Sequence, residues 1–190
     1  MLDTIRRNNA EEVGRTKWRL ASEGLPMRKG RRPKTIIGPL HIQCNDHGER
    51  KYLNQLLNDV LAWPYIEPTS KSLNDLDRVS IRLQESVAAN DFSAFIHDTE
   101  FARVHLEAPT IVMVLPLVCV HWAMVKRWAE PHYLQSFGLV PAGTVIVYTP
   151  RNREELEVCY SLFFESYYSA SKFAREVAVQ ASRMEQQIAY

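Results

Sequence analysis

The feature that most constrains the fold is a long amphipathic segment near the C-terminus, residues 152–188. Its apolar residues follow the alternating four-and-three spacing of one helix face, namely Leu156, Tyr160, Phe163, Tyr167, Ala170, Ala174, Val177, Ala181, Met184 and Ile188. Asn152 stands at the expected N-cap, and Glu155 follows three residues later, as in a capping box. A helix of this length would run about 50 Å, longer than a small domain is wide. We therefore expect its Ala-rich last third to dock either on an N-terminal helix or on a second subunit, which would form a homodimer.

The middle of the chain shows the two-residue period of β-strands. In "DRVSIRLQE", residues 77–85, apolar and polar side chains alternate, and "EFARVHLE", residues 100–107, alternates likewise. "APTIVMVLPL", residues 108–117, is apolar on both faces, as a central strand would be. A turn at Ala108-Pro109 would join the last two segments into an antiparallel hairpin over residues 100–115. "GTVIVYT", residues 143–149, reads as another central strand.

Two further segments favour helices, so the predicted class is α+β. Residues 48–63 place leucines at helical spacing before Pro64, and residues 1–23 suit a peripheral N-terminal helix. The strands outnumber those of a regular βαβ alternation. We predict a mainly antiparallel sheet with helices packed on it and a long C-terminal helix over 152–188. A length of 190 residues suits a single domain, 1–190.

Composition argues against several classes of protein and partner. The net charge is +1, and the basic run 27–34 lacks aromatic residues that could stack bases, so we expect no nucleic-acid partner. Three widely spaced cysteines form neither a disulfide framework nor a metal or redox pair. No apolar run reaches the ~18 residues that span a bilayer, and the N-terminus lacks a secretory signal. We expect a soluble, cytoplasmic protein with no membrane partner.

Several aromatic and titratable side chains crowd into "KRWAEPHYLQS", residues 126–136. Trp128 and Tyr133, with Trp122 on the preceding helix, could form the aromatic wall of a site for a flat ligand. His132 could orient or deprotonate that ligand, since an imidazole titrates near neutrality. The alternatives are that Trp128 belongs to the core and that His132 caps the C-terminus of the helix.

A second group of candidates lies on a strand and at the start of the last helix. Strand alternation places Phe101, Arg103 and His105 on one face, and Phe101, like Tyr148, is a candidate substrate contact. His105 would act as general base or hydrogen-bond donor, whereas Arg103 could stabilise an oxyanion but not take a proton. Arg151, beside Tyr148, could hold a carboxylate, enolate or carbonyl at the helix N-terminus. It could equally pair with a neighbouring glutamate on the surface.

Motifs of common enzyme classes do not occur in the chain. Its histidines show neither the H-x-H nor the H-x-x-x-H spacing, so we expect no metal site. The sequence contains no G-x-S-x-G, no G-x-G-x-x-G and no P-loop. Hydrolase, dehydrogenase and kinase chemistry therefore has no support in the sequence.

Three motifs in a fixed order resemble the luciferase-domain family. They are an E-F-A-x-x-H strand at 100–105, a W-x-x-x-H after a helix at 128–132, and a Y-x-P-R-N-x-E-E at 148–155 that opens the last helix. The similarity begins in "GLPMRKGRRPKTI" and covers roughly residues 18–170. This resemblance implies an enzyme that uses O₂ directly on an activated α-pyrone, a hydroxylated hispidin, without flavin, haem or metal.

Departures from the family pattern leave the reaction open. The family's H-x-H reads Arg103-Val104-His105 here, the next strand lacks its usual histidine, and G-W-G-x-x-H-P-L-A-G has become residues 127–136. The first hypothesis is a cofactor-independent oxygenase of specialised metabolism, acting on an apolar conjugated polyketide- or terpenoid-like molecule. The second is a non-oxidative cyclase or pericyclase in the same pocket. The third is a non-catalytic ligand-binding or interaction module.

Overall fold

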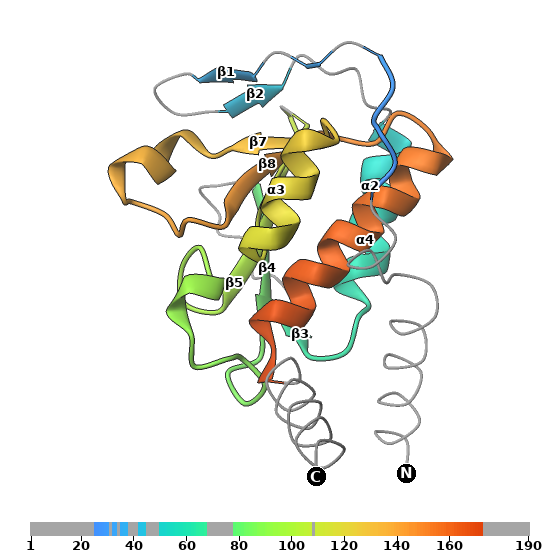
Figure 1. The fold of residues 1–190 in the computed structure, drawn as a ribbon. Helices are drawn as coiled ribbons and strands as arrows, with labels where there is room; N and C mark the ends of the chain where they lie inside the picture. The colour runs from blue at the N-terminus through green and yellow to red at the C-terminus, as the bar shows by residue number, and fades with distance from the viewer. Residues whose placement is uncertain are drawn as a thin grey trace, which may run out of the picture.

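A six-stranded antiparallel sheet forms the centre of the molecule (Figure 1). The computed structural model describes residues 25–30, 32–33, 35–37, 42–44, 50–67, 78–107 and 109–172. In spatial order the strands are β3 (Ile66–Glu67), β4 (Arg78–Leu83), β5 (Glu100–His105), β6 (Thr110–Val114), β8 (Thr144–Val147) and β7 (Ala129–Pro131). The predicted hairpin is the β5–β6 pair, and a separate hairpin joins β1 (Thr35–Ile37) to β2 (Ile42–Cys44). The predicted α+β class is confirmed.

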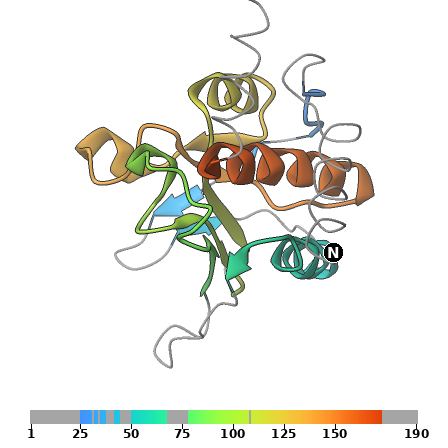
Figure 2. The ribbon, with the colours of Figure 1, turned by 90° about the horizontal axis from the view of Figure 1, so that it is seen from below.

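Helix α4 (Arg153–Ala170) packs on the sheet, where it contacts β5 and β6. It lies between α2 (Arg50–Leu61), which packs against it, and α3 (Leu117–Val125), which connects β6 to β7 (Figures 1 and 2). Two short 3₁₀ helices, η1 (Phe92–Ala94) and η2 (Tyr133–Phe137), lie in the connecting loops. The predicted helix over 1–23 lies outside the described residues. The predicted continuous helix over 152–188 is wrong at its C-terminal side, because α4 ends at Ala170, where Ser171 is extended and forms a β-bridge with Ala88. Residues beyond 172 lie outside the described residues. No helix in the described part of the chain is both long and apolar enough to cross a membrane.

The start of α4 follows the pattern expected from the sequence. The Asn152 side chain accepts a hydrogen bond from the Glu155 backbone N–H at 2.9 Å, which satisfies one of the free donors of the first turn. Further along, Phe163 is fully buried in the main core. The Ser166 hydroxyl donates to the Val114 carbonyl of β6 at 2.7 Å. Both apolar burial and a polar contact therefore fix the helix on the sheet.

A β-bulge on β5 changes which side chains share a face. Ile81 pairs with Ala102, but the next residue, Arg82, pairs with Glu100, so Phe101 is the extra residue. Phe101 is fully buried and meets the Tyr167 ring of α4 edge-on, with a centroid distance of 6.1 Å. The prediction that Phe101 shares a face with Arg103 and His105 is therefore wrong.

Truncation of Phe163 should destabilise the protein strongly, because the ring is completely enclosed between α4 and the sheet. For Phe163→Ala we expect the free energy of unfolding to fall by about 3–5 kcal/mol, measured by urea denaturation. The matched control is Phe92→Ala, since the Phe92 side chain is 86% exposed, and its change should stay within about 0.5 kcal/mol. Equal losses in the two variants would contradict this placement of the core.

Candidate functional site

The sheet face turned away from α4 carries a row of side chains from four strands. Arg103 pairs with Val112, Val112 with Ile146, and Ile146 with Glu130. Directly paired residues of antiparallel strands point to the same face, so the four side chains are neighbours. Val112 and Ile146 form a small cluster separate from the main core. His105 belongs to the next row, since it pairs with Thr110.

A cavity of about 440 Å³ lies at the β7 end of this row. Its walls come mostly from one stretch of chain, and they are Glu130, Pro131, His132, Tyr133, Gln135, Ser136 and Ile146. The volume is within the range of small-molecule sites. The structure thus places His132 and Tyr133, two predicted site residues, side by side in a cavity wall.

His132 is held as a buried, neutral imidazole. Its side chain is only 7% exposed and stacks on Tyr133 with a centroid distance of 4.9 Å. Its Nδ1 accepts a hydrogen bond from the Leu134 backbone N–H at 3.3 Å, so the neutral ring carries its proton on Nε2. Burial, and then the positive charge of Arg103, lower the pKa of His132. The ring is therefore suited to donate a hydrogen bond from Nε2 rather than to act as a base.

His132 does not cap the C-terminus of the preceding helix, although one of its two interpretations predicts this. Strand β7 separates His132 from α3, and the imidazole instead caps the N-terminus of η2. His132 comes two residues after Glu130, and its backbone N–H donates to the Thr144 carbonyl of β8. Because alternate residues along an extended segment point the same way, Glu130 and His132 both face the cavity.

Glu130 is a titratable group that the sequence pattern does not single out as catalytic. Its carboxyl group is half-buried and accepts a hydrogen bond from the Tyr148 phenol at 3.3 Å. Burial raises the pKa of Glu130, and this outweighs the lowering by the Tyr148 hydrogen bond and the Arg32 charge. A carboxyl group whose pKa is raised by burial in a cavity is a candidate for proton transfer. The E-x-H spacing of Glu130 and His132 indicates this pair only if the segment is extended. The sequence pattern instead favours the end of a helix at residues 126–130.

The Arg103 guanidinium is already paired with Glu100, so Arg103 influences His132 in the cavity wall through its charge. Its Nε and Nη2 donate to the two carboxylate oxygens of Glu100 at 2.8 and 2.9 Å. The bulge at Phe101 makes this pair possible, because it brings Glu100 onto the Arg103 face. His105 is half-buried, and its partner in the strand register is Arg78 of β4. His105 is not part of the cavity lining.

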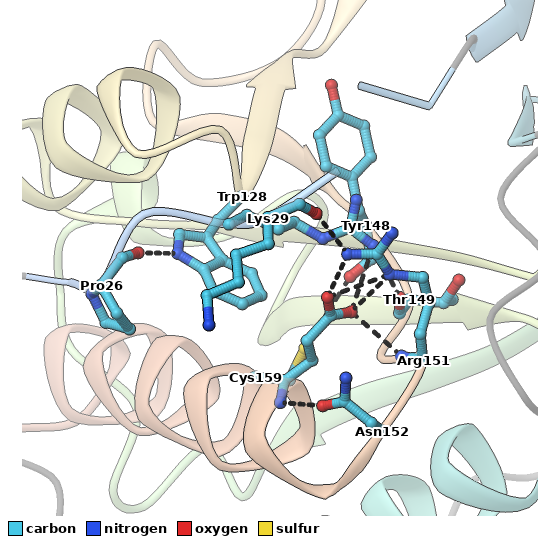
Figure 3. Close-up of polar contacts among 10 residues, drawn as sticks. Pro26, Lys29, Trp128, Tyr148, Thr149, Arg151, Asn152 and Cys159 are labelled. Atoms are coloured by element: carbon cyan, nitrogen blue, oxygen red, sulfur yellow. Dashed lines mark hydrogen bonds and ion pairs between the residues drawn. The ribbon is translucent and has the colours of Figure 1, made fainter. Parts of the chain in front are cut away.

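Arg151 belongs to an ionic network at the start of α4 rather than to the cavity (Figure 3). Its Nε lies 3.0 and 3.1 Å from the two Glu155 carboxylate oxygens, and its Nη2 also donates to this group. Arg28 donates to the same carboxylate at 3.3 Å. Burial alone would raise the pKa of Glu155, but hydrogen bonds from Arg151 and the charges of both arginines lower it overall. Of the two predicted roles for Arg151, the structure shows pairing with Glu155, in a largely buried setting.

Trp128 and Tyr148 support this network and do not line the cavity wall. The Arg28 guanidinium carbon lies 5.8 Å from the Trp128 ring centroid and 5.2 Å from that of Tyr148. The Trp128 indole N–H donates to the Pro26 carbonyl at 2.6 Å. Trp122, on α3, is 42% exposed and likewise absent from the cavity lining. Trp122 and Trp128 thus do not line this cavity, and Trp128 belongs to the main core, as the alternative interpretation of it predicts.

The three motifs lie within one segment, and comparison with known families covers the same segment. Residues 98–166 match the family model of the luciferase domain. The predicted family resemblance is thereby confirmed, and the matching segment contains both the cavity and the start of α4. No curated protein and no solved structure matches the chain. Among the residues that the structure describes, no group of three His, Cys, Asp or Glu side chains is placed to hold a metal ion.

The ionic network should make stability depend on pH. The folded-state pKa of Glu155 is lowered, so its stabilisation is present above the ordinary value of 4.5 and lost as pH falls below it. We expect Glu155→Gln to cost about 3 kcal/mol at pH 7, measured by urea unfolding, because it leaves two arginines without their carboxylate. This variant should also lose less stability than the wild type between about pH 5 and pH 3.

The control for this measurement is Glu154→Gln, the exposed neighbour in the same helical turn. It removes the same charge next to the same helix terminus but leaves the network intact. Its pH dependence should match that of the wild type. An equal loss of pH dependence in both variants would show that general charge near α4, and not the Glu155 network, is responsible.

Proposed function

We propose that the protein is a cofactor-independent enzyme of specialised metabolism that deprotonates a conjugated enol or phenol in the cavity and lets it react with O₂. One observation carries this proposal: Glu130 and His132 face the same cavity from one extended segment. The pKa of Glu130 is raised and that of His132 is lowered. The two groups therefore provide a proton acceptor and a neutral hydrogen-bond donor within one small site.

The cavity walls favour a flat, mostly apolar substrate. Tyr133, Pro131 and Ile146 offer aromatic and aliphatic surface, and Gln135 and Ser136 lie at the same cavity. The Gln135 side chain is already engaged with the Ala142 carbonyl, which leaves the His132 N–H as the favoured polar contact for a ligand oxygen. A polyketide-like pyrone with an acidic hydroxyl group matches this combination.

The chemistry begins with proton transfer from the substrate hydroxyl to the Glu130 carboxylate. A raised pKa brings this carboxyl group closer to the pKa of an enol, which makes it a better-matched base near neutral pH. The resulting enolate oxygen is stabilised by the His132 Nε2–H and by the field of Arg103. The electron-rich enolate carbon then supplies both electrons of a new C–O bond to O₂, and the proton on Glu130 completes a hydroperoxide.

A non-oxidative cyclisation is the second candidate. The raised pKa of Glu130 also leaves more of this group protonated, so it can donate to a substrate carbonyl together with His132. Such polarisation accelerates ring closure of a polyene held in a compact conformation. The two candidates use the same cavity and differ in whether O₂ is consumed.

Oxygen uptake with an electron-rich hydroxy-pyrone separates these candidates. We expect uptake with the wild-type protein and a kcat about 10²–10⁴-fold lower for Glu130→Gln, because an amide cannot accept the proton. Glu85→Gln, at an exposed turn residue, is the matched control and should keep wild-type activity. Product formation that persists without O₂ would favour the cyclase. Absence of any product from electron-rich pyrones would rule out the oxygenase.

The pH dependence of the reaction should report the Glu130 carboxyl group. Activity needs its deprotonated form, so kcat/KM should fall as pH decreases through its folded-state pKa. Because burial raises this pKa, the fall should begin above the ordinary value of 4.5. The measurement is a pH–rate profile from about pH 4 to pH 8. A rate that stays constant down to pH 4.5 would exclude Glu130 as the base.

A further inference from the structure

A short segment far from the cavity in sequence is bound against the end of the sheet. This strap, residues 25–30, contains the buried Leu25 and Arg28 side chains. Three hydrogen bonds tie its backbone to the body: Arg28 N–H to the Lys126 carbonyl at 3.0 Å, the Trp128 indole to the Pro26 carbonyl, and Arg151 Nη2 to the Lys29 carbonyl at 2.6 Å. Gly30 ends the strap at a φ of 90°, with the Arg151 guanidinium packed beside it. The strap is therefore a fixed part of this end of the fold.

Arg28 connects the strap to the interior. Its side chain is almost fully buried, and its Nη2 donates to the Thr149 carbonyl and the Glu155 carboxylate, both at 3.3 Å. Its flat guanidinium lies near the rings of Trp128 and Tyr148. A guanidinium held by hydrogen bonds at its edge and rings at its faces has little freedom to move.

The Tyr148 side chain reaches from this network to the cavity. Its ring is fully buried, and its backbone N–H donates to the Trp128 carbonyl at 3.0 Å. At the far end, its hydroxyl donates to Glu130 Oε2 at 3.3 Å. The ring thus has Arg28 beside it and the proposed base at its tip.

We propose that Arg28 is a positioning residue for the Glu130 carboxyl group, acting through the Tyr148 ring. By fixing that ring, Arg28 keeps the phenol directed at the carboxylate. The catalytic meaning of this contact rests on the proposed function, but its effect on Glu130 itself does not. Arg28 lies about a hundred residues before Glu130 in the chain and does not line the cavity.

Other charged and titratable groups near Glu130 must be separated from this effect. Arg32, which follows the strap, lowers the pKa of Glu130 by its charge, and the Tyr148 hydrogen bond lowers it as well. His132 lies two residues along the same segment and is itself influenced by Arg103. Since Arg32 is the cation that acts directly on Glu130, the expected route from Arg28 runs through Tyr148.

The test is a direct titration of Glu130 that needs no substrate. The protein is labelled with ¹³C at glutamate side-chain carboxyl groups, and the Glu130 resonance is identified by its loss in Glu130→Gln. We expect Arg28→Met and Tyr148→Phe each to raise the Glu130 pKa, because each removes the stabilising phenol contact. The double variant should show the same pKa as Tyr148→Phe alone, since both changes interrupt one connection.

Arg153→Gln is the matched control, because it removes an exposed arginine from the first turn of α4 and leaves the Glu155 network, the strap and the Tyr148 ring in place. It should leave the Glu130 pKa unchanged. If Arg28→Met does not fold, Arg28→Lys replaces it; this change keeps the charge opposite Glu155 but loses the flat contact, and should also raise the pKa. An unchanged pKa in the Arg28 variant, equal shifts in the Arg28 and Arg153 variants, or additive shifts in the double variant would overturn the proposal. Because the titration involves no turnover, its result is independent of whether the protein oxygenates a pyrone.

Discussion

The Glu155 carboxylate, shared by Arg28 and Arg151, holds together three parts of the molecule that are distant in sequence. Arg28 comes from the strap, Arg151 from the end of the sheet, and Glu155 from the first turn of α4. A buried charge without a partner is costly, so each member of the network constrains the other two. The Y-x-P-R-N-x-E-E motif supplies much of this network. The residues of this motif thus form the junction between helix, strap and sheet.

The cavity combines two groups whose ionised forms burial disfavours. Glu130 has a raised pKa and His132 a lowered one, so both tend toward neutrality at this site. A strongly charged ligand would find little compensation there, whereas a weak acid can exchange a proton with Glu130 while its oxygen contacts His132. This balance depends on strand register, since pairing of Glu130 with Ile146 points both titratable groups to the same side.

Local patterns predicted the elements better than they predicted the site. Periodicity identified the β5–β6 hairpin, α2 and the capped start of α4, because each is set by its own residues. The bulge that turns the Phe101 side chain into the core adds a single residue to β5, and no local sequence pattern indicates it. The sequence leaves two interpretations open for Trp128, and its contacts with Pro26 and Arg28, about a hundred residues earlier, place it under the strap. Likewise, the apolar pattern of α3 could not reveal that its Trp122 face is left exposed.

Shifts of isoleucine methyl resonances on ligand addition would show whether the cavity beside β7 binds a conjugated weak acid, as we propose. Ile146 lines the cavity, whereas Ile111 is buried on the opposite face of the sheet and serves as an internal control. On titration with an electron-rich hydroxy-pyrone, the Ile146 methyl resonance should move in a saturable manner and the Ile111 resonance should not. A pyrone that binds without moving the Ile146 resonance would contradict this placement of the site.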